Sequence, residues 1–226
     1  MKAFKQQDSG EQQDQVMEDS GAPDIAARTQ LVDALFLVNG THDIVLRRFG
    51  DPNILPNLHV TLVFLFHVSF YSEAKGHLDP GFPWKLLSEM LNTLLMGVQE
   101  YSWIENERFP QSERDPHRIL PEDYAMRSLL WVDKYFPSDW FSNDKSDDDE
   151  KFMELPSNYE ERRTRTLWLG VQIARDGDCL QYDREKHRFS VSPNLNMEID
   201  MEIDMKIDME IDMEIDMEAV DNCEGP

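Results

Sequence analysis

The longest apolar run in the chain, LHVTLVFLFHV at residues 58–68, is the feature that most constrains its fold. The run is too short for a helix that spans a bilayer, and with the following SFY it is too long for an ordinary strand. It therefore predicts a helix over 58–71 that is buried on most sides and forms the centre of the core. A second helix is expected after Pro83, because apolar residues there recur at helical spacing: Trp84, Leu87, Leu91, Leu94, Leu95 and Val98.

Before the apolar run, residues 31–38 place their apolar side chains at helical spacing. Gly40 is a helix stop signal, so we expect this helix to end there and a separate segment to follow at 43–49. The sequence GDPNILPN, at 50–57, then interrupts regular structure with its prolines and asparagines. Residues 1–28 are rich in polar residues and contain too few apolar side chains to form a core, so we expect them to be disordered.

The C-terminal part of the folded region carries signals for a helix and a hairpin. Ser157 followed by Glu160 matches a capping box, which predicts a helix over 158–175. Gly170 lies on the apolar face of this helix and would permit close packing against another element. Apolar residues then alternate on both sides of a charged turn and predict a small β-hairpin: Leu180, Tyr182, Phe189 and Val191.

These patterns predict a mainly α fold: an antiparallel array of helical hairpins with long irregular loops, a small C-terminal β-hairpin and disordered termini. The segment 101–149 supplies the longest irregular stretch, because prolines divide it repeatedly. We expect one helical domain over 29–192 between a disordered segment, 1–28, and a disordered tail, 193–226.

The chain is strongly acidic, with a formal net charge of −23, and about half of that charge lies in the tail. From Met197 the tail repeats the tetrapeptide MEID. The alternation of apolar and acidic residues favours a strand, but like charges facing each other across a ladder destabilise it. We therefore expect a disordered tail, with a partner-binding segment as the alternative. Such acidity opposes binding to nucleic acid phosphates unless a local basic patch exists.

Arg162, Arg163 and Arg165 are the best candidates for a basic contact with nucleic acid or with a protein partner. They lie within one helical turn and follow Glu160 and Glu161. The interpretation that we favour is a solvated helix face with partial ion pairing, and a nucleic-acid contact is the alternative.

Cysteine content and hydropathy indicate the compartment. Cys179 and Cys223 cannot form a disulfide framework, which favours a reducing environment. The N-terminal residues lack the apolar core of a signal peptide, and the chain contains no apolar run of membrane-spanning length. We expect a soluble, intracellular protein that does not associate with membranes.

The sequence offers no recognisable catalytic or ligand-binding set. It has neither a glycine-rich phosphate loop nor a nucleophile elbow. His59 and His67 lie in the apolar run without further metal ligands at suitable spacing, so we expect satisfied core or helix-end histidines. The acidic loop at 143–151 lacks the glycine turn of a calcium loop. We therefore expect a protein that is not an enzyme and that uses no cofactor or metal.

The stretch ILPEDYAMRSLLW, at 119–131, places the adjacent carboxylates Glu122 and Asp123 near Arg127. Adjacent side chains on a helix diverge by about 100°, so this pair does not suit the two sides of one substrate bond. Directly after Pro121, the two acids instead suit the first turn of a short helix. We expect Arg127 to be their ion-pair partner. The apolar residues that follow are expected to anchor the segment to the core: Met126, Leu129, Leu130 and Trp131.

Four segments occur in order along the chain: LHVTLVFLFHVSFY at 58–71, PWKLLSEMLNTLL at 83–95, RILPEDYAMRSLLW at 118–131 and RTLWLGVQIA at 165–174. In this order they resemble the C-terminal helical region of the ever-shorter-telomeres telomerase-activating proteins and their relatives in nonsense-mediated mRNA decay. Fungal members carry close variants of GDPNILP, LLWVDKYFP and DDDEKFMELPS. The resemblance covers roughly residues 30–192, and its structural signature is Trp84, Leu91, Asn92, Pro121, Glu122, Asp123, Arg127 and Trp131.

The resemblance implies a stack of antiparallel helices, often labelled a DNA/RNA-binding domain. In the family this region follows a tetratricopeptide domain that binds phosphopeptides, and residues 1–29 supply no such domain, so the chain looks like a truncated or divergent paralogue. The implied role is an adaptor or scaffold in mRNA decay or telomere maintenance, in the nucleus, the cytoplasm or both. Its partners would be proteins of mRNA decay or telomerase complexes. The alternatives are a direct DNA/RNA-binding module, which the acidic charge disfavours, and a degenerate fragment with no retained activity.

Overall fold

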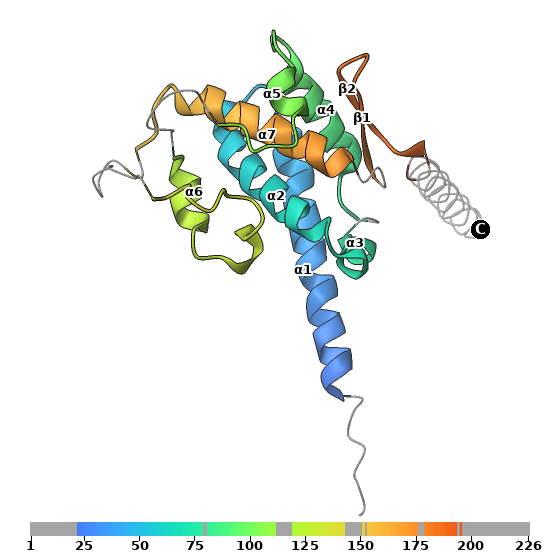
Figure 1. Cartoon of the computed structure of the whole chain (residues 1–226). Coiled ribbons are helices and arrows are strands. Elements are labelled where there is room, and N and C mark those ends of the chain that lie inside the picture. The colour runs from blue at the N-terminus through green and yellow to red at the C-terminus, as the bar shows by residue number, and fades with distance from the viewer. Residues whose placement is uncertain are drawn as a thin grey trace, which may run out of the picture.

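The computed structural model describes residues 22–78, 81–111, 119–142, 151, 153–175, 179–193 and 195 (Figure 1). This part of the chain is mainly helical and contains a two-stranded antiparallel sheet, as the sequence predicts. The expected disorder of residues 1–21 and of the MEID tail lies outside the described residues, and so does the acidic loop at 143–150. Among the described helices, none combines the length and the apolar character needed to cross a bilayer.

The elements surround a single core. In order they are α1 (Ala22–Leu46), the 3-10 helix η1 (Pro52–Ile54), α2 (Leu55–Val68), α3 (Ser72–Leu78), α4 (Trp84–Leu95), α5 (Ser102–Glu105), α6 (Pro121–Met126), the 3-10 helix η2 (Leu130–Val132), α7 (Asn158–Ala174), β1 (Leu180–Asp183) and β2 (Arg188–Val191). The longest connections lie between α5 and α6 and between η2 and α7.

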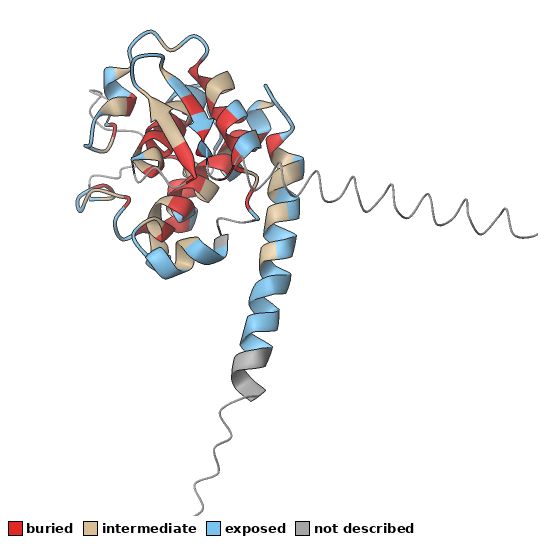
Figure 2. Cartoon of the chain, turned by 90° about the vertical axis from the view of Figure 1, so that its right-hand side faces the viewer, coloured by how far each residue is buried: buried red, intermediate tan, exposed pale blue. Residues whose placement is uncertain are grey.

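Helix α2 lies at the centre of the core, which confirms the prediction from its apolar run. Leu58, Leu62 and Val63 are almost fully buried, and the helix packs most extensively against α7. Figure 2 shows the buried residues gathered in the body of the molecule that these helices form. The helix ends before the predicted limit of 71, because the N–H of Tyr71 bonds the carbonyl of Val68 in a tighter turn.

The predicted break at 50–57 contains the start of α2. Gly50 has a φ of +78°, a left-handed conformation that glycine adopts without strain. Asp51 then caps η1, because its Oδ1 accepts the backbone N–H of Asn53 at 2.9 Å. Pro56 lies in the first turn of α2, where a missing N–H removes no intrahelical hydrogen bond. The two prolines of this segment therefore lie at the starts of η1 and α2.

Helix α1 differs from the expectations for the N-terminal region. It begins within the segment 1–28, which was expected to be disordered, and it continues through Gly40 to Leu46. The predicted stop at Gly40 is wrong, because a glycine inside a helix costs only about 1 kcal/mol and packing holds the end of α1. Leu46 is buried there, and His42 Nε2 lies 2.8 Å from Thr61 Oγ1 of α2. The rest of the helix is largely exposed and extends away from the body (Figures 1 and 2).

Helix α4 confirms the amphipathic stripe that begins at Trp84. Its residues Leu87 and Leu91 are fully buried. Gly170 of α7 faces this helix, and a Cβ at that position would lie 2.9 Å from Leu91 Cδ1 and 3.2 Å from Phe189 Cζ. The absence of a side chain at Gly170 therefore permits the close packing of α7 against α4 and β2, as predicted.

The predicted hairpin also forms, with β1 antiparallel to β2 and Leu180 paired with Val191. Asn92 of α4 attaches the hairpin to the helices. Its Nδ2 donates to the carbonyl of Phe189 at 2.9 Å, and its Oδ1 accepts the N–H of Phe189 at 2.8 Å. The side-chain amide thus bonds both backbone groups of one β2 residue, as a neighbouring strand would.

Replacing Asn92 with Asp should lower the free energy of unfolding by roughly 1–3 kcal/mol. The carboxylate retains the acceptor for the Phe189 N–H but places a second acceptor against the Phe189 carbonyl, so that carbonyl loses its donor. Chemical denaturation of the two proteins measures the change. The control Asn57→Asp introduces the same charge at an exposed position in the first turn of α2, where an acid is favourable. Equal stability of Asn92→Asp and the unchanged protein would contradict this role for Asn92.

Candidate functional site

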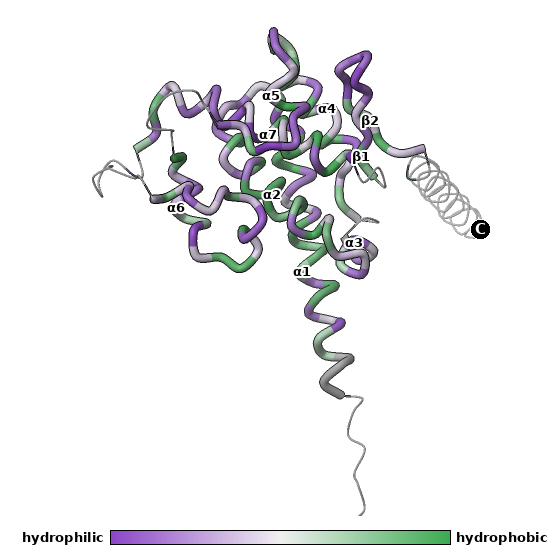
Figure 3. Tube along the Cα trace, in the orientation of Figure 1, coloured by the Kyte–Doolittle hydropathy of each residue, from purple (hydrophilic) through white to green (hydrophobic). Residues whose placement is uncertain are grey.

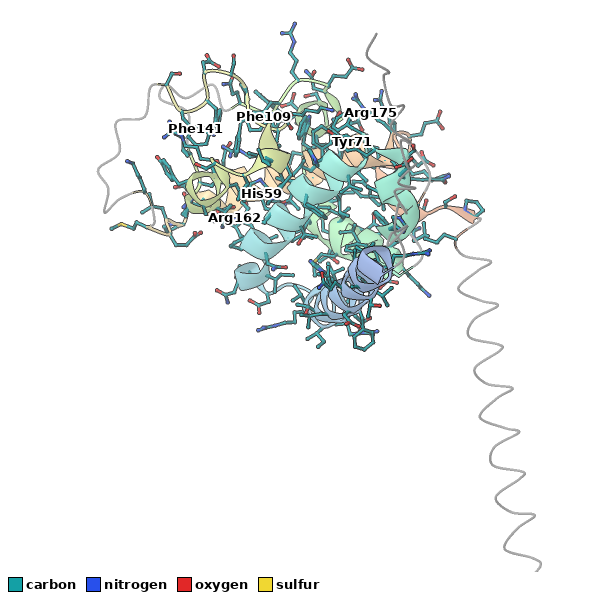
Figure 4. The ribbon with its side chains drawn as sticks, turned by 90° about the horizontal axis from the view of Figure 1, so that it is seen from below. His59, Tyr71, Phe109, Phe141, Arg162 and Arg175 are labelled. Carbon is teal, nitrogen blue, oxygen red and sulfur yellow. The ribbon has the colours of Figure 1, made fainter. Side chains whose placement is uncertain are left out.

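A buried group of charged side chains joins α2, α6 and α7, and we call it the ion-pair cluster. It consists of His59, Glu122, Asp123, Arg162 and Arg165, each at most 8% exposed. The histidine comes from the apolar run of α2, the acids from the first turn of α6 and the arginines from α7. Figure 4 shows His59 and Arg162 close together on their helices. Charges buried this deeply require partners that replace their lost hydration.

Glu122 is bound from two helices at once. Its Oε1 accepts from Arg162 Nε at 2.6 Å, and its Oε2 accepts from Arg162 Nη2 at 2.9 Å. His59 Nδ1 lies 2.8 Å from Oε1 and donates to it, because a carboxylate can only accept. Burial by itself raises the pKa of Glu122, but the hydrogen bonds and charges of His59 and Arg162 outweigh burial and lower this pKa to about 2. Glu122 is therefore ionised throughout the neutral range.

Tyr135 extends this arrangement to the other side of His59. Its hydroxyl oxygen lies 2.5 Å from His59 Nε2, and its side chain is buried. Burial raises the pKa of Tyr135 well above its usual value, so the hydroxyl keeps its proton. Both ring nitrogens of His59 thus have polar partners, which confirms the prediction of a satisfied core histidine. For His67 the same prediction is wrong, because its buried Nδ1 has no hydrogen-bond partner among the described residues and lies 3.6 Å from Asp133 Oδ1.

Asp123 is bound by α7 and by its own backbone. Its Oδ2 accepts from Arg165 Nη1 at 2.5 Å and from the N–H of Leu120 at 2.9 Å. The guanidinium also donates to Glu161 Oε1 at 3.0 Å and lies 4.6 Å from the ring centroid of Trp140. Burial lowers the pKa of Arg165, but the negative charge of Asp123 outweighs burial and raises this pKa above its usual value. Arg165 therefore remains charged inside the core.

The structure confirms the placement of the acids and corrects their partner. Pro121 begins α6, and the bond from the Leu120 N–H to Asp123 belongs to the first helical turn. Glu122 and Asp123 diverge, as predicted, and reach different arginines. The expected ion pair with Arg127 is wrong, because that guanidinium lies over the ring of Phe141, 4.8 Å from its centroid. The partners instead come from α7, far along the sequence.

The apolar residues that follow these acids anchor the segment only in part. Met126 is buried, and Trp131 packs edge-on against Phe64 with their ring centroids 5.8 Å apart. Leu129 is 42% exposed and Leu130 is 92% exposed. The expectation that these two leucines contact the core is therefore wrong, because the turn into η2 directs them to the surface.

The structure also corrects the interpretation of the arginine triplet. Arg162 and Arg165 are buried and bind carboxylates, so they form neither a solvated face nor a surface contact for a phosphate. The spacing of the triplet on α7 explains the difference, because positions three residues apart share the helix face that packs on α2 and α6. Arg163 lies on another face of α7 and donates to carbonyls at the C-terminal end of α4.

Arg163 adds to the backbone cap of α4, in which the N–H of Met96 bonds the carbonyl of Thr93. Its Nε donates to the carbonyl of Leu94 at 2.8 Å, and its Nη2 donates to the carbonyl of Met96 at 2.7 Å. Its Nη1 also lies 3.2 Å from Glu160 of the same helix. The capping box predicted at Ser157 is not formed by that side chain, which makes no cap hydrogen bond. Helix α7 nevertheless begins at residue 158, as predicted.

Sequence reasoning did not anticipate Tyr135, Trp140 or Glu161 as parts of this arrangement. Tyr135 and Trp140 lie in the irregular segment, which has no periodicity from which a buried position can be inferred. A signal did exist for His59, because a titratable residue inside a continuous apolar run requires a buried polar partner. The identity of that partner, 63 residues away, could not be read from the sequence.

The side chains of the ion-pair cluster are almost fully buried. His59, Glu122 and Asp123 line neither the cleft between the loop after α4, α5 and α7 nor the cleft beside the hairpin. Among the described residues, no group of three or more His, Cys, Asp or Glu side chains could hold a metal ion. Each carboxylate of the cluster is instead bound by an arginine that stays charged. Comparison of the chain with family models, with curated proteins and with solved structures finds no match.

Proposed function

We propose that the protein is a non-catalytic adaptor or scaffold of the mRNA-decay and telomerase-regulating class, and that α1 is the surface through which it holds a partner. The pathway is the one implied by the sequence resemblance. The observation that supports protein binding is the exposed apolar side of α1. Phe36 is 83% exposed, Leu37 70%, Ile44 68% and Val32 63%. Large apolar side chains grouped in this way mark interaction surfaces in soluble proteins.

The exposed side of α1 has the geometry of a helix-packing surface. Val32, Phe36, Gly40 and Ile44 are spaced by four residues, so they form one ridge along the helix. A Cβ at Gly40 would meet nothing within 4 Å, so the ridge has an open gap there. A ridge with a gap accepts the side chains of a second helix. Figure 3 shows that hydrophobic residues continue along α1 beyond the body of the molecule. We therefore propose a partner that contributes an amphipathic helix.

The ion-pair cluster supports this role by fixing the body that carries α1. Its ion pairs join α2 to α6 and α6 to α7 inside the core. The alternative of direct nucleic-acid binding rests on the DNA/RNA-binding label of the resembled family and on the arginine triplet. Because Arg162 and Arg165 are buried and Arg163 bonds the end of α4, these residues do not offer a phosphate-binding face.

Affinity purification from a cell extract tests the proposal. The unchanged protein should recover mRNA-decay or telomerase proteins, and Phe36→Glu should reduce that recovery by about tenfold, because it places a charge on the apolar ridge. The control Leu130→Glu introduces the same charge at an apolar residue that is even more exposed but lies on η2. It should leave the recovery unchanged. Recovery of no such protein, or equal loss in both variants, would overturn the proposal.

The two alternative functions give different results in direct measurements. Saturable binding of single-stranded RNA at low salt would favour the nucleic-acid-binding module, whereas we expect no measurable affinity. The absence of a cooperative thermal transition would favour a degenerate fragment, whereas we expect cooperative unfolding.

A further inference from the structure

A cleft of about 600 Å³ lies between the loop after α4, helix α5 and the first turns of α7. Figure 1 shows these elements side by side at the end of the molecule opposite the free end of α1. The apolar part of the lining includes Val98, Ile104 and Leu167. Trp103 also lines the cleft, and it is 39% exposed. This volume lies in the range of about 300–1,000 Å³ that is typical of ligand sites.

The charged residues of the cleft are predominantly acidic. Among the described lining residues, Glu100, Glu160 and Glu161 are acidic and Arg163 is basic. The guanidinium of Arg163 is bonded to two backbone carbonyls at the end of α4 and to Glu160, so it does not act as a free cation. The carboxylate of Glu160 is 69% exposed and lies in the first turn of α7. Because Glu161 is paired with Arg165, Glu100 and the exposed Glu160 supply the negative charge of the cleft, which favours a cation over a phosphate or a carboxylate.

The indole of Trp103 indicates which kind of cation suits the cleft. An exposed indole beside carboxylates suits a group that is both positively charged and able to stack, since a cation over the ring face is attracted by its quadrupole. The planar guanidinium of arginine stacks on indole and binds a carboxylate with two parallel hydrogen bonds, which the ammonium of lysine cannot do. The apolar lining would cover the methylene groups and an adjacent apolar side chain.

We propose that this cleft binds a short segment of a partner protein through an arginine side chain flanked by apolar residues. The indole of Trp103 covers the guanidinium, and Glu100 and Glu160 bind its N–H groups. The choice of a protein segment rests on the proposed adaptor function, whereas the requirement for a guanidinium rests on the cleft alone. The cleft is separate from α1, so a partner can occupy either surface without the other.

Binding to two pools of short immobilised peptides tests this proposal. Both pools carry the same mixture of apolar and small residues around a central position, which is arginine in one pool and citrulline, its uncharged analogue, in the other. The full-length protein should bind the arginine pool about tenfold more strongly than the citrulline pool. Trp103→Ala should reduce binding to the arginine pool by about fivefold to tenfold.

A pair of variants with equal net charge separates the site from general attraction to an acidic protein. Glu100→Gln/Glu160→Gln should reduce binding to the arginine pool by about tenfold. The control Glu73→Gln/Glu185→Gln removes the same charge from exposed positions on α3 and in the hairpin turn, and it should bind like the unchanged protein. Equal binding to the two pools, or equal loss in the two double variants, would overturn the proposal. Because Phe36→Glu should leave the peptide binding unchanged, failure of the α1 surface and failure of this cleft give distinct results.

Discussion

Replacing Arg165 with methionine should lower the free energy of unfolding by roughly 3–5 kcal/mol, the largest effect that we expect from one substitution at the ion-pair cluster. The side chain is fully buried, and its removal leaves the carboxylate of Asp123 without its charged partner. Asp123 Oδ1 already has no hydrogen-bond partner among the described residues, so the remaining bonds matter more. Denaturation by urea, followed by far-ultraviolet circular dichroism, measures the loss.

Two further variants show whether the loss arises from the unpaired carboxylate. The double change Arg165→Met/Asp123→Leu should recover part of the stability, because it removes the uncompensated charge together with its partner. Arg47→Met, which breaks an exposed ion pair with Asp43 on α1, should have little effect. A double variant that is less stable than the single variant would contradict the assignment of the loss to Asp123.

Lowering the pH should destabilise the protein through Glu122. The pKa of this carboxyl is about 2 in the folded protein against 4.5 for the unperturbed group, so acidification protonates the unfolded chain first. The stabilisation is therefore complete above pH 4.5, declines as the pH falls, and is lost near pH 2. A difference of this size corresponds to roughly 3 kcal/mol. Measurements of unfolding free energy across this range follow the decline.

The variant Glu122→Gln isolates the contribution of this carboxyl. It should be less stable than the unchanged protein at pH 6, because the bidentate pair with Arg162 is lost, and its stability should depend less on pH between 4.5 and 2. Glu185→Gln, at an exposed position in the hairpin turn, should retain the original pH profile. An unchanged pH slope in Glu122→Gln would show that other groups cause the acid sensitivity.

The helices of the core were predictable because their signals are local. The apolar run of α2, the stripe of α4 and the acids after Pro121 each depend on residues within a few positions of one another. The stop assigned to Gly40 failed because a local signal is weak. A glycine disfavours a helix by about 1 kcal/mol, and tertiary contacts at one end of α1 override it.

The candidate sites were far less predictable, since their members come from distant parts of the chain. Glu122 and Arg162 are 40 residues apart, and Glu122 and His59 are 63 residues apart. Arg127 is close to the acids in sequence and was the expected partner, but it lies over Phe141 instead. No sequence motif predicts that the glutamates of the cleft lie near the indole of Trp103.

The sequence by itself determined the helices α2, α4, α6 and α7, where the hairpin turns, and that Glu122 and Asp123 lie in a first helical turn. Periodicity and turn chemistry act between residues that are near one another in the chain, so one sequence suffices to detect them. Only the tertiary structure decided that Arg162 and Arg165 lie inside and that the apolar side of α1 lies outside. Burial depends on which helices pack together, and that choice follows from the shapes and charges of side chains brought close by folding.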